Sequence, residues 1–195
     1  MFDFKNLFVL DLANNHQGDL DHGFEIIDDC SDIIKKNNAK GAIKFQFRQL
    51  DTFIHNDFKN NNEVKHLSRF QSTKLKQEDY KKLFDRVKEK GLYTICTPFD
   101  EESVDIIENM KFDLIKVASC SAKDWPLLEK ISQTNIPIIV STGGLELNNI
   151  DHLVSFFKHR NCNFSIMHCV AIYPTPDAEF YLNQIDKLKN RYPDI

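Results

Sequence analysis

Residues 92–118 read LYTICTPFDEESVDIIENMKFDLIKVA and contain one complete unit of the fold. The apolar run Leu92 to Cys96 predicts a buried strand, and Leu114 to Ala118 predicts a second one. Between them, Glu101 to Met110 has the apolar spacing of an amphipathic helix. A strand, a helix and a strand in so short a stretch are typical of a parallel sheet with covering helices.

The same alternation runs through the rest of the chain and gives about six strand–helix units, with no linker that divides them. The polar stretch from Arg48 to Lys76 is longer than an ordinary connection, so we interpret it as a lid or excursion that shapes a binding site, with Asn61 a candidate contact. The further predicted strands are 7–10, 41–47, 138–140 and 164–167, and the further predicted helices are 20–36, 77–90, 126–132, 148–158 and 179–189.

Two architectures fit this alternation, an open doubly wound sheet and a closed (β/α)8 barrel. The glycine-rich phosphate-binding motifs of the open folds are missing, whereas polar residues stand at the end of nearly every predicted strand, as on the active-site face of a barrel. We therefore predict an α/β fold of the (β/α)8 TIM-barrel type. Because such barrels typically need ~250 residues, 195 residues are expected to form one partial domain, 1–195, truncated after about six βα units.

Composition excludes several classes of protein. The formal net charge of -4 argues against a nucleic-acid partner, and no apolar run reaches the length of a membrane span, so we expect a soluble, cytoplasmic protein. The five cysteines include no C-x-x-C pair, which argues against a disulfide framework or a zinc knuckle. We interpret Cys96, Cys120 and Cys169 as small reduced core residues.

Lys44 and Lys116 each place an ammonium group within an apolar strand. Burying an unpaired charge is costly, so each lysine needs an anionic partner or a lowered pKa. One alternative is a structural pair with a carboxylate such as Asp11, and the other is a pair of lysines that bind a doubly charged anion. In the second case hydroxyl groups at the strand ends would add donors: Thr97, Ser119, Ser141 and Thr142.

Eight segments stand out along the chain: LDLANNHQGD (10–19), IKFQFR (43–48), CTPFDEESVD (96–105), IKVASCS (115–121), DWPLLEKI (124–131), IPIIVSTGG (136–144), MHCVAIYPTP (167–176) and RYPDI (191–195). Together, in this order and at matching intervals, they resemble the sialic acid synthase (N-acetylneuraminate synthase) family. The resemblance covers almost the entire chain. It implies a barrel that condenses phosphoenolpyruvate with an N-acyl-mannosamine or related amino sugar, giving a nonulosonic acid and phosphate, with a divalent metal, Mn²⁺ or Mg²⁺.

The resemblance also implies roles for individual residues. Asp11, Lys44 and Lys116 are the expected catalytic residues, with Asp11 in the position of a family glutamate that serves as base or orienting group. Thr97, Ser119 and Ser141 join the two lysines around phosphoenolpyruvate. Tyr173 would contact the sugar acceptor, and Gln46, two residues beyond Lys44 on the same face of its strand, could reach ligand as well.

The chain differs from known members of the family at two positions, and the remainder of the barrel is expected beyond Ile195. Ser121 stands where known members have an acidic residue, and Ala171 where they have an asparagine, which fits a branch with a different acceptor sugar. Strands 7 and 8, the two metal-binding histidines and an antifreeze-like domain are expected beyond Ile195, so His16 and His168 are not assigned as metal ligands. The complete protein is expected to be a homodimer, and the isolated 195-residue chain to be inactive.

Two other functions remain open at this point. The chain could be a non-catalytic fragment or interaction module, since missing strands leave open sheet edges. It could also be a Schiff-base pyruvate aldolase in which Lys116 is the nucleophile, although that function leaves Lys44 and the hydroxyl groups without a role.

Overall fold

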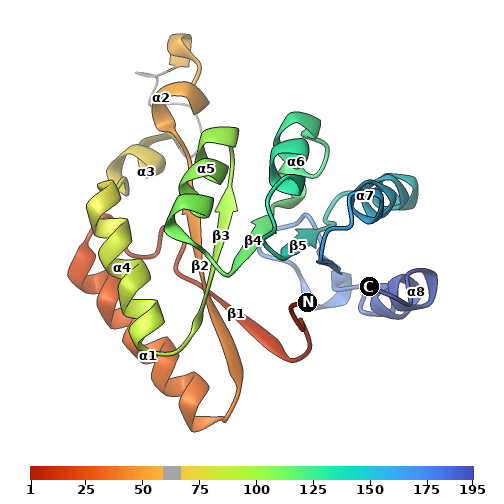
Figure 1. The fold of residues 1–195 in the computed structure, drawn as a ribbon, viewed down its shortest axis with the longest axis horizontal. Helices are drawn as coiled ribbons and strands as arrows, with labels where there is room; N and C mark the ends of the chain where they lie inside the picture. Colours follow the sequence, from red (N-terminus) through yellow and green to blue (C-terminus); the bar gives the residue numbers. More distant parts are fainter. Residues whose placement is uncertain (59–66) are drawn as a thin grey trace. The chain divides into compact units, whose positions relative to one another are not determined.

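The computed structural model describes residues 1–58 and 67–195. It consists of two compact units: the first unit is Phe4–Leu114, and the second unit is Ile115–Ile195 together with Met1–Asp3. The chain has an α/β fold of the TIM-barrel type, in which parallel strands alternate with helices, and this confirms the predicted fold class (Figure 1). No helix in the described part of the chain is long and apolar enough to cross a membrane.

The first unit contains three parallel strands in the order β1-β2-β3. Helices α1 and α4 lie side by side, with α1 against β2 and α4 against β3 (Figure 1). Its elements are β1 (Leu7–Asp11), α1 (Leu20–Lys36), β2 (Lys40–Phe47), α2 (Leu50–Phe53), a 3₁₀ turn (Asn56–Phe58), α3 (Leu67–Ser72), α4 (Gln77–Glu89), β3 (Tyr93–Pro98) and α5 (Glu101–Met110).

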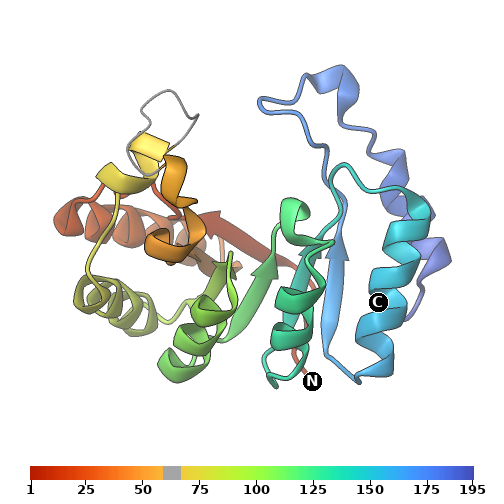
Figure 2. The ribbon, with the colours of Figure 1, turned by 90° about the horizontal axis from the view of Figure 1, so that it is seen from above.

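The second unit continues the pattern with parallel strands in the order β4-β5-β6. Figure 2 shows α6 and α7 packed alongside these strands, and α8 beside α7. The Arg191 guanidinium of α8 donates two hydrogen bonds of 2.7 Å to the Asp151 carboxylate of α7. Its elements are β4 (Leu114–Val117), a 3₁₀ turn (Ser119–Ser121), α6 (Trp125–Ser132), β5 (Ile138–Ser141), α7 (Leu147–His159), β6 (Phe164–Met167), a 3₁₀ turn (Asp177–Glu179) and α8 (Asn183–Arg191).

Aspartates fix where several helices begin. Asp19 precedes α1 and its carboxylate accepts hydrogen bonds from the backbone N–H groups of Asp21 and His22. Asp100 precedes α5 and accepts from Ser103 N–H at 2.7 Å, while its second oxygen accepts from Gln49 N–H at 2.8 Å. Asp100 therefore caps a helix and also ties the end of β3 to the chain that leaves β2.

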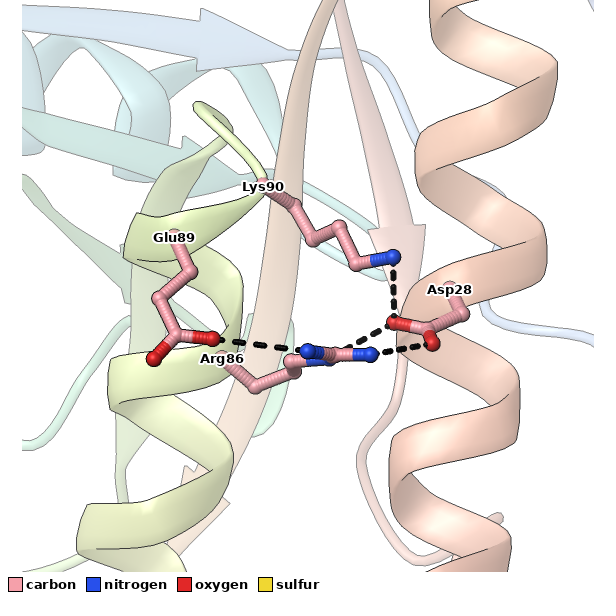
Figure 3. Close-up of polar contacts among 4 residues, drawn as sticks. All are labelled: Asp28, Arg86, Glu89 and Lys90. Atoms are coloured by element: carbon pink, nitrogen blue, oxygen red, sulfur yellow. Dashed lines mark hydrogen bonds and ion pairs between the residues drawn. The ribbon is translucent and has the colours of Figure 1, made fainter.

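An ion cluster joins α1 to α4 on the surface of the first unit (Figure 3). Arg86 donates to both carboxylate oxygens of Asp28, at 2.8 and 2.6 Å, and Lys90 lies 2.9 Å from the same carboxylate. Glu89 contacts the other side of the Arg86 guanidinium. The hydrogen bond from Arg86 is the main cause that lowers the pKa of Asp28 to about 2, so this cluster is charged over the whole neutral range.

Apolar side chains from each strand–helix unit form the core, as the sequence periodicity predicts. In the first unit Phe112 packs edge-on against Phe45, Phe47 and Phe84, with ring centroids 4.9 to 5.6 Å apart. In the second unit Phe157 is fully buried. Leu128 of α6 is fully buried too.

The described part of the excursion after β2 contains helices α2 and α3. Two sequence interpretations are corrected. The last helix spans Asn183–Arg191 instead of 179–189, because Asp177–Glu179 forms a separate 3₁₀ turn. Cys96 is a buried core residue as expected, but Cys120 is exposed and Cys169 is partly exposed.

Candidate functional site

Parallel register places the predicted residues of the first unit on one face of the sheet. Asp11 of β1 is the register partner of Lys44 in β2, and Gln46 of β2 is the partner of Thr97 in β3. Because side chains alternate along a strand, Lys44 and Gln46 point to the same side, and so do their partners. The four residues therefore lie at the carboxyl ends of three neighbouring strands, where βα folds bind ligands.

Lys44 and Asp11 form an ion pair with 2.9 Å between Nζ and Oδ1. The Lys44 side chain is 14% exposed and the Asp11 side chain 54% exposed, so the pair sits at the boundary between the sheet and solvent. The Lys44 carbonyl accepts a 2.9 Å hydrogen bond from Ala13 N–H, which fixes the chain after β1 against β2. The structural pairing considered for Lys44 is thus present, and it also leaves both groups within reach of an incoming ligand.

Arg48, which the sequence analysis did not include among the site residues, orients Gln46. Its guanidinium donates to Gln46 Oε1 at 3.0 Å and stacks on the rings of Phe99 and Phe70, 3.9 and 4.3 Å from their centroids. The Gln46 amide oxygen is held by this contact, so its NH₂ group is the part that can donate to a ligand. The i, i+2 spacing of Gln46 and Arg48 on one strand end is the signal that could have found Arg48.

A cavity of about 220 Å³ opens beside Gln46 in the first unit. Its walls combine apolar rings with amide and hydroxyl groups, a mixture suited to a polar small molecule. Burial raises the pKa of Tyr80 in this wall to about 12, so its hydroxyl remains protonated and able to donate a hydrogen bond. Residues that line the cavity include Asn14, Gln46, Arg48, Phe70, Thr73 and Tyr80.

In the second unit Lys116 is the centre of a buried polar cluster. It is 9% exposed, and its Nζ donates to the Val117 carbonyl at 3.0 Å and to Ser141 Oγ. Ser141 ends β5, two residues beyond Ile139, the register partner of Lys116, so both side chains point to the same face. Cys169, after β6, donates from Sγ to Ser141 Oγ at 3.2 Å.

Ser119 and Gly143 complete this cluster. Ser119 Oγ accepts a 3.0 Å hydrogen bond from Gly143 N–H. A Cβ atom on Gly143 would lie 3.0 Å from Ser119 Oγ and 3.2 Å from Cys169 Cβ, so a side chain at position 143 would crowd both neighbours. Thr142 is turned away, since its hydroxyl donates to the Met167 carbonyl at 2.9 Å. An ammonium group and hydroxyls in one buried cluster can bind an oxyanion.

Tyr173, His168 and His16 each lie in a different environment. The Tyr173 side chain is fully exposed in the segment that follows β6. His168 Nε2 is hydrogen-bonded to the Phe180 carbonyl at 2.9 Å. His16 is completely buried, its Nδ1 accepts from Gly18 N–H at 3.0 Å, and burial lowers its pKa.

Three further points of the sequence analysis concern metal ligands, Asn61 and Ser121. Within residues 1–58 and 67–195, no group of three or more His, Cys, Asp or Glu side chains is arranged to hold a metal ion. Asn61 lies outside the described residues. Ser121, which stands in place of an acidic residue, is buried in the turn after Ser119.

Comparison with known proteins gives consistent matches. Residues 33–195 match the model of the NeuB family. The chain is 31% identical over 192 residues to the spore coat polysaccharide biosynthesis protein SpsE of Bacillus subtilis, over 95% of this chain and 50% of that protein. It is 27% identical over 197 residues to the N,N'-diacetyllegionaminic acid synthase of Campylobacter jejuni, over 96% of this chain and 58% of that protein.

Among solved structures, that of a putative spore coat polysaccharide biosynthesis protein E from Chromobacterium violaceum matches with a TM-score of 0.95 and 44% identity. The match covers 98% of this chain and 57% of that one. The chain thus spans about half the length of the curated relatives that it matches.

Proposed function

The chain belongs to the NeuB family, and we propose from that membership that it carries the phosphoenolpyruvate-binding residues of a nonulosonic acid synthase. The proposed reaction joins phosphoenolpyruvate to an N-acyl-mannosamine-like amino sugar and releases phosphate. The observation that supports it most strongly is the buried cluster in which Lys116 donates to Ser141, with Ser119 next to it at Gly143. Such a cluster offers positive charge and hydroxyl donors to a phosphate or carboxylate group.

Five residues are proposed from the family resemblance to contact phosphoenolpyruvate. They are Lys44, Thr97, Lys116, Ser119 and Ser141. In the reaction, C3 of the enol phosphate forms a bond to the aldehyde carbon of the sugar, water adds to C2, and the C2–O bond to phosphate breaks. Negative charge grows on the departing phosphate, and fixed ammonium groups stabilise that charge better than water does.

Asp11 is proposed to act through Lys44. The 2.9 Å ion pair holds the Lys44 ammonium at the carboxyl end of β2 and supports an orienting role. Because the Asp11 carboxylate is 54% exposed, it could also accept a proton from an attacking water, the role of a general base.

The acceptor sugar is proposed to contact Gln46 and Tyr173. Gln46 lines the cavity of the first unit. Because its amide oxygen accepts a hydrogen bond from Arg48, its NH₂ group is the part that can donate to a sugar hydroxyl. Tyr173 is exposed and offers a ring and a hydroxyl group to a partner. With Ser121 and Ala171 in place of the acidic residue and the asparagine, the acceptor is proposed to differ from N-acetylmannosamine itself.

A divalent metal, Mn²⁺ or Mg²⁺, and a homodimer are proposed for the complete protein on family grounds alone. The side chains in residues 1–58 and 67–195 form no ligand cluster for such an ion.

Phosphoenolpyruvate binding by the 195-residue chain tests the proposal. Calorimetric titration is expected to show saturable binding that weakens as salt is raised, because the contacts are ionic. Because the 195-residue chain alone is expected to have no turnover, the acceptor is identified with the complete protein, by adding Mn²⁺ and a panel of N-acyl-mannosamines and measuring phosphate release. A chain that is folded by circular dichroism yet shows no binding of phosphoenolpyruvate at millimolar concentration would refute the proposal.

A further inference from the structure

Cys169 lies against the buried polar cluster around Lys116 in the second unit and has no role in the proposed function. It follows β6, whose Met167 is the register partner of Ser141 at the end of β5. Its Sγ is 3.2 Å from Ser141 Oγ, and the missing side chain of Gly143 gives its Cβ the space it occupies. The thiol thus reaches the hydroxyl group to which Lys116 also donates.

The hydrogen bonds at Ser141 determine which way its own proton can point. A serine hydroxyl has one proton to donate and two lone pairs that accept. Lys116 Nζ donates to one lone pair of Ser141 Oγ, and the Cys169 thiol donates to the other. With both lone pairs engaged, the hydroxyl proton is directed away from Lys116 and Cys169 and becomes a fixed donor.

We propose that Cys169 is a positioning residue that holds the Ser141 hydroxyl as a hydrogen-bond donor to the anionic oxygen of phosphoenolpyruvate. This inference rests on the proposed function. Cys169 forms no covalent bond in this role and need not be a thiolate, because the thiol acts through its proton. A preorganised donor binds an anion more tightly than a hydroxyl that must first turn, since the cost of ordering is already met by the fold.

The magnitude follows from the strength of one weak hydrogen bond. A neutral hydrogen bond contributes roughly 0.5–1.5 kcal/mol and a thiol is a weak donor, so removing it is expected to weaken binding by about 2- to 5-fold. Cys169→Ala is therefore expected to raise the Kd for phosphoenolpyruvate by about that factor. Cys169→Ser, which keeps a donor at the same place, is expected to restore binding to within about 2-fold of the original chain.

A double-mutant cycle distinguishes positioning from a general loss of packing. If Cys169 acts through Ser141, Cys169→Ala has no further effect in a chain that already carries Ser141→Ala. The matched control is Cys120→Ala, which removes an exposed thiol of the same unit whose Sγ lies 3.9 Å from Ser121 Oγ. The control is expected to bind phosphoenolpyruvate like the original chain.

The experiment measures the Kd for phosphoenolpyruvate by calorimetry for the original chain and the five variants, with thermal unfolding as a check on folding. The inference is supported by weakening in Cys169→Ala, recovery in Cys169→Ser and no further loss in the double variant. It is overturned if Cys169→Ala binds like the original chain, or if it weakens binding equally with and without Ser141. If the original chain and Cys120→Ala also fail to bind, the proposed function itself is wrong, and the role of Cys169 fails with it.

Discussion

Replacing Lys116 by methionine is the sharpest perturbation of the proposed anion site. Methionine keeps most of the unbranched stem and removes the charge, so the packing around β4 changes little. Lys116 is 9% exposed, and at an effective dielectric constant near 20 a unit charge about 4 Å from a phosphate contributes roughly 4 kcal/mol of Coulomb energy. Part of that energy is lost again in desolvation.

Lys116→Met is expected to lose about 2–3 kcal/mol of binding free energy for phosphoenolpyruvate, in the range of a charge-assisted hydrogen bond. This loss corresponds to a Kd that is about 30- to 150-fold higher. Calorimetric titration measures it, with Lys123→Met, an exposed lysine of the same unit, as the matched control. A change of less than about 2-fold in Lys116→Met would refute the anion site. Borohydride with pyruvate is expected to leave no adduct on the original chain; an adduct at Lys116 would instead support the aldolase.

Two predictions concern stability and its dependence on pH. In urea titrations at pH 7, Arg86→Ala is expected to lower the free energy of unfolding more than Lys82→Ala, which removes an exposed ion pair on the same helix. Equal effects of the two variants would contradict the role of the cluster. Because the folded-state pKa of Asp28 is about 2, its contribution is present above pH 4 and is lost as pH falls from about 4 toward 2. His16 is buried with a lowered pKa, so the unfolded chain binds a proton more readily and stability is expected to fall as pH drops below about 6.5. His16→Gln should remove that fall between pH 6.5 and 5, and an unchanged pH profile in this variant would show that other groups cause it.

Most of the fold was predictable because it depends on local periodicity. Helix α1 begins and ends at Leu20 and Lys36, as the apolar spacing and the cap at Asp19 indicate. Strand β6 likewise has the predicted bounds, Phe164–Met167. The segment after β2 was not predictable in the same way, because α2 and α3 are too short for their periodicity to show and are held by contacts with distant residues, such as Phe53 with Phe99.

The candidate site was predictable where it depends on strand ends and not where it depends on contacts across strands. The pairing of Lys44 with Asp11 follows once β1 and β2 are known to be parallel neighbours. The contact of Cys169 with Ser141 joins the segment after β6 to the last residue of β5, and the sequence neighbour of Cys169, His168, gives no indication of this contact. The apolar residues around Cys169 suggested a core residue. Periodicity predicts which face of the strand a side chain takes, but it does not show whether a polar group of a neighbouring strand lies on that face.

Arg48 links the excursion after β2 to the proposed acceptor side of the site. Its guanidinium lies 3.9 Å from the ring centroid of Phe99, just after β3, and 4.3 Å from that of Phe70 in α3. The same guanidinium donates to Gln46 Oε1. A shift of α3 relative to β3 would therefore have to break a cation–π stack or turn the Gln46 amide. Sequence changes within the excursion can thus alter the orientation of Gln46 without touching the ligand, which is a physical route to a change in the proposed acceptor preference.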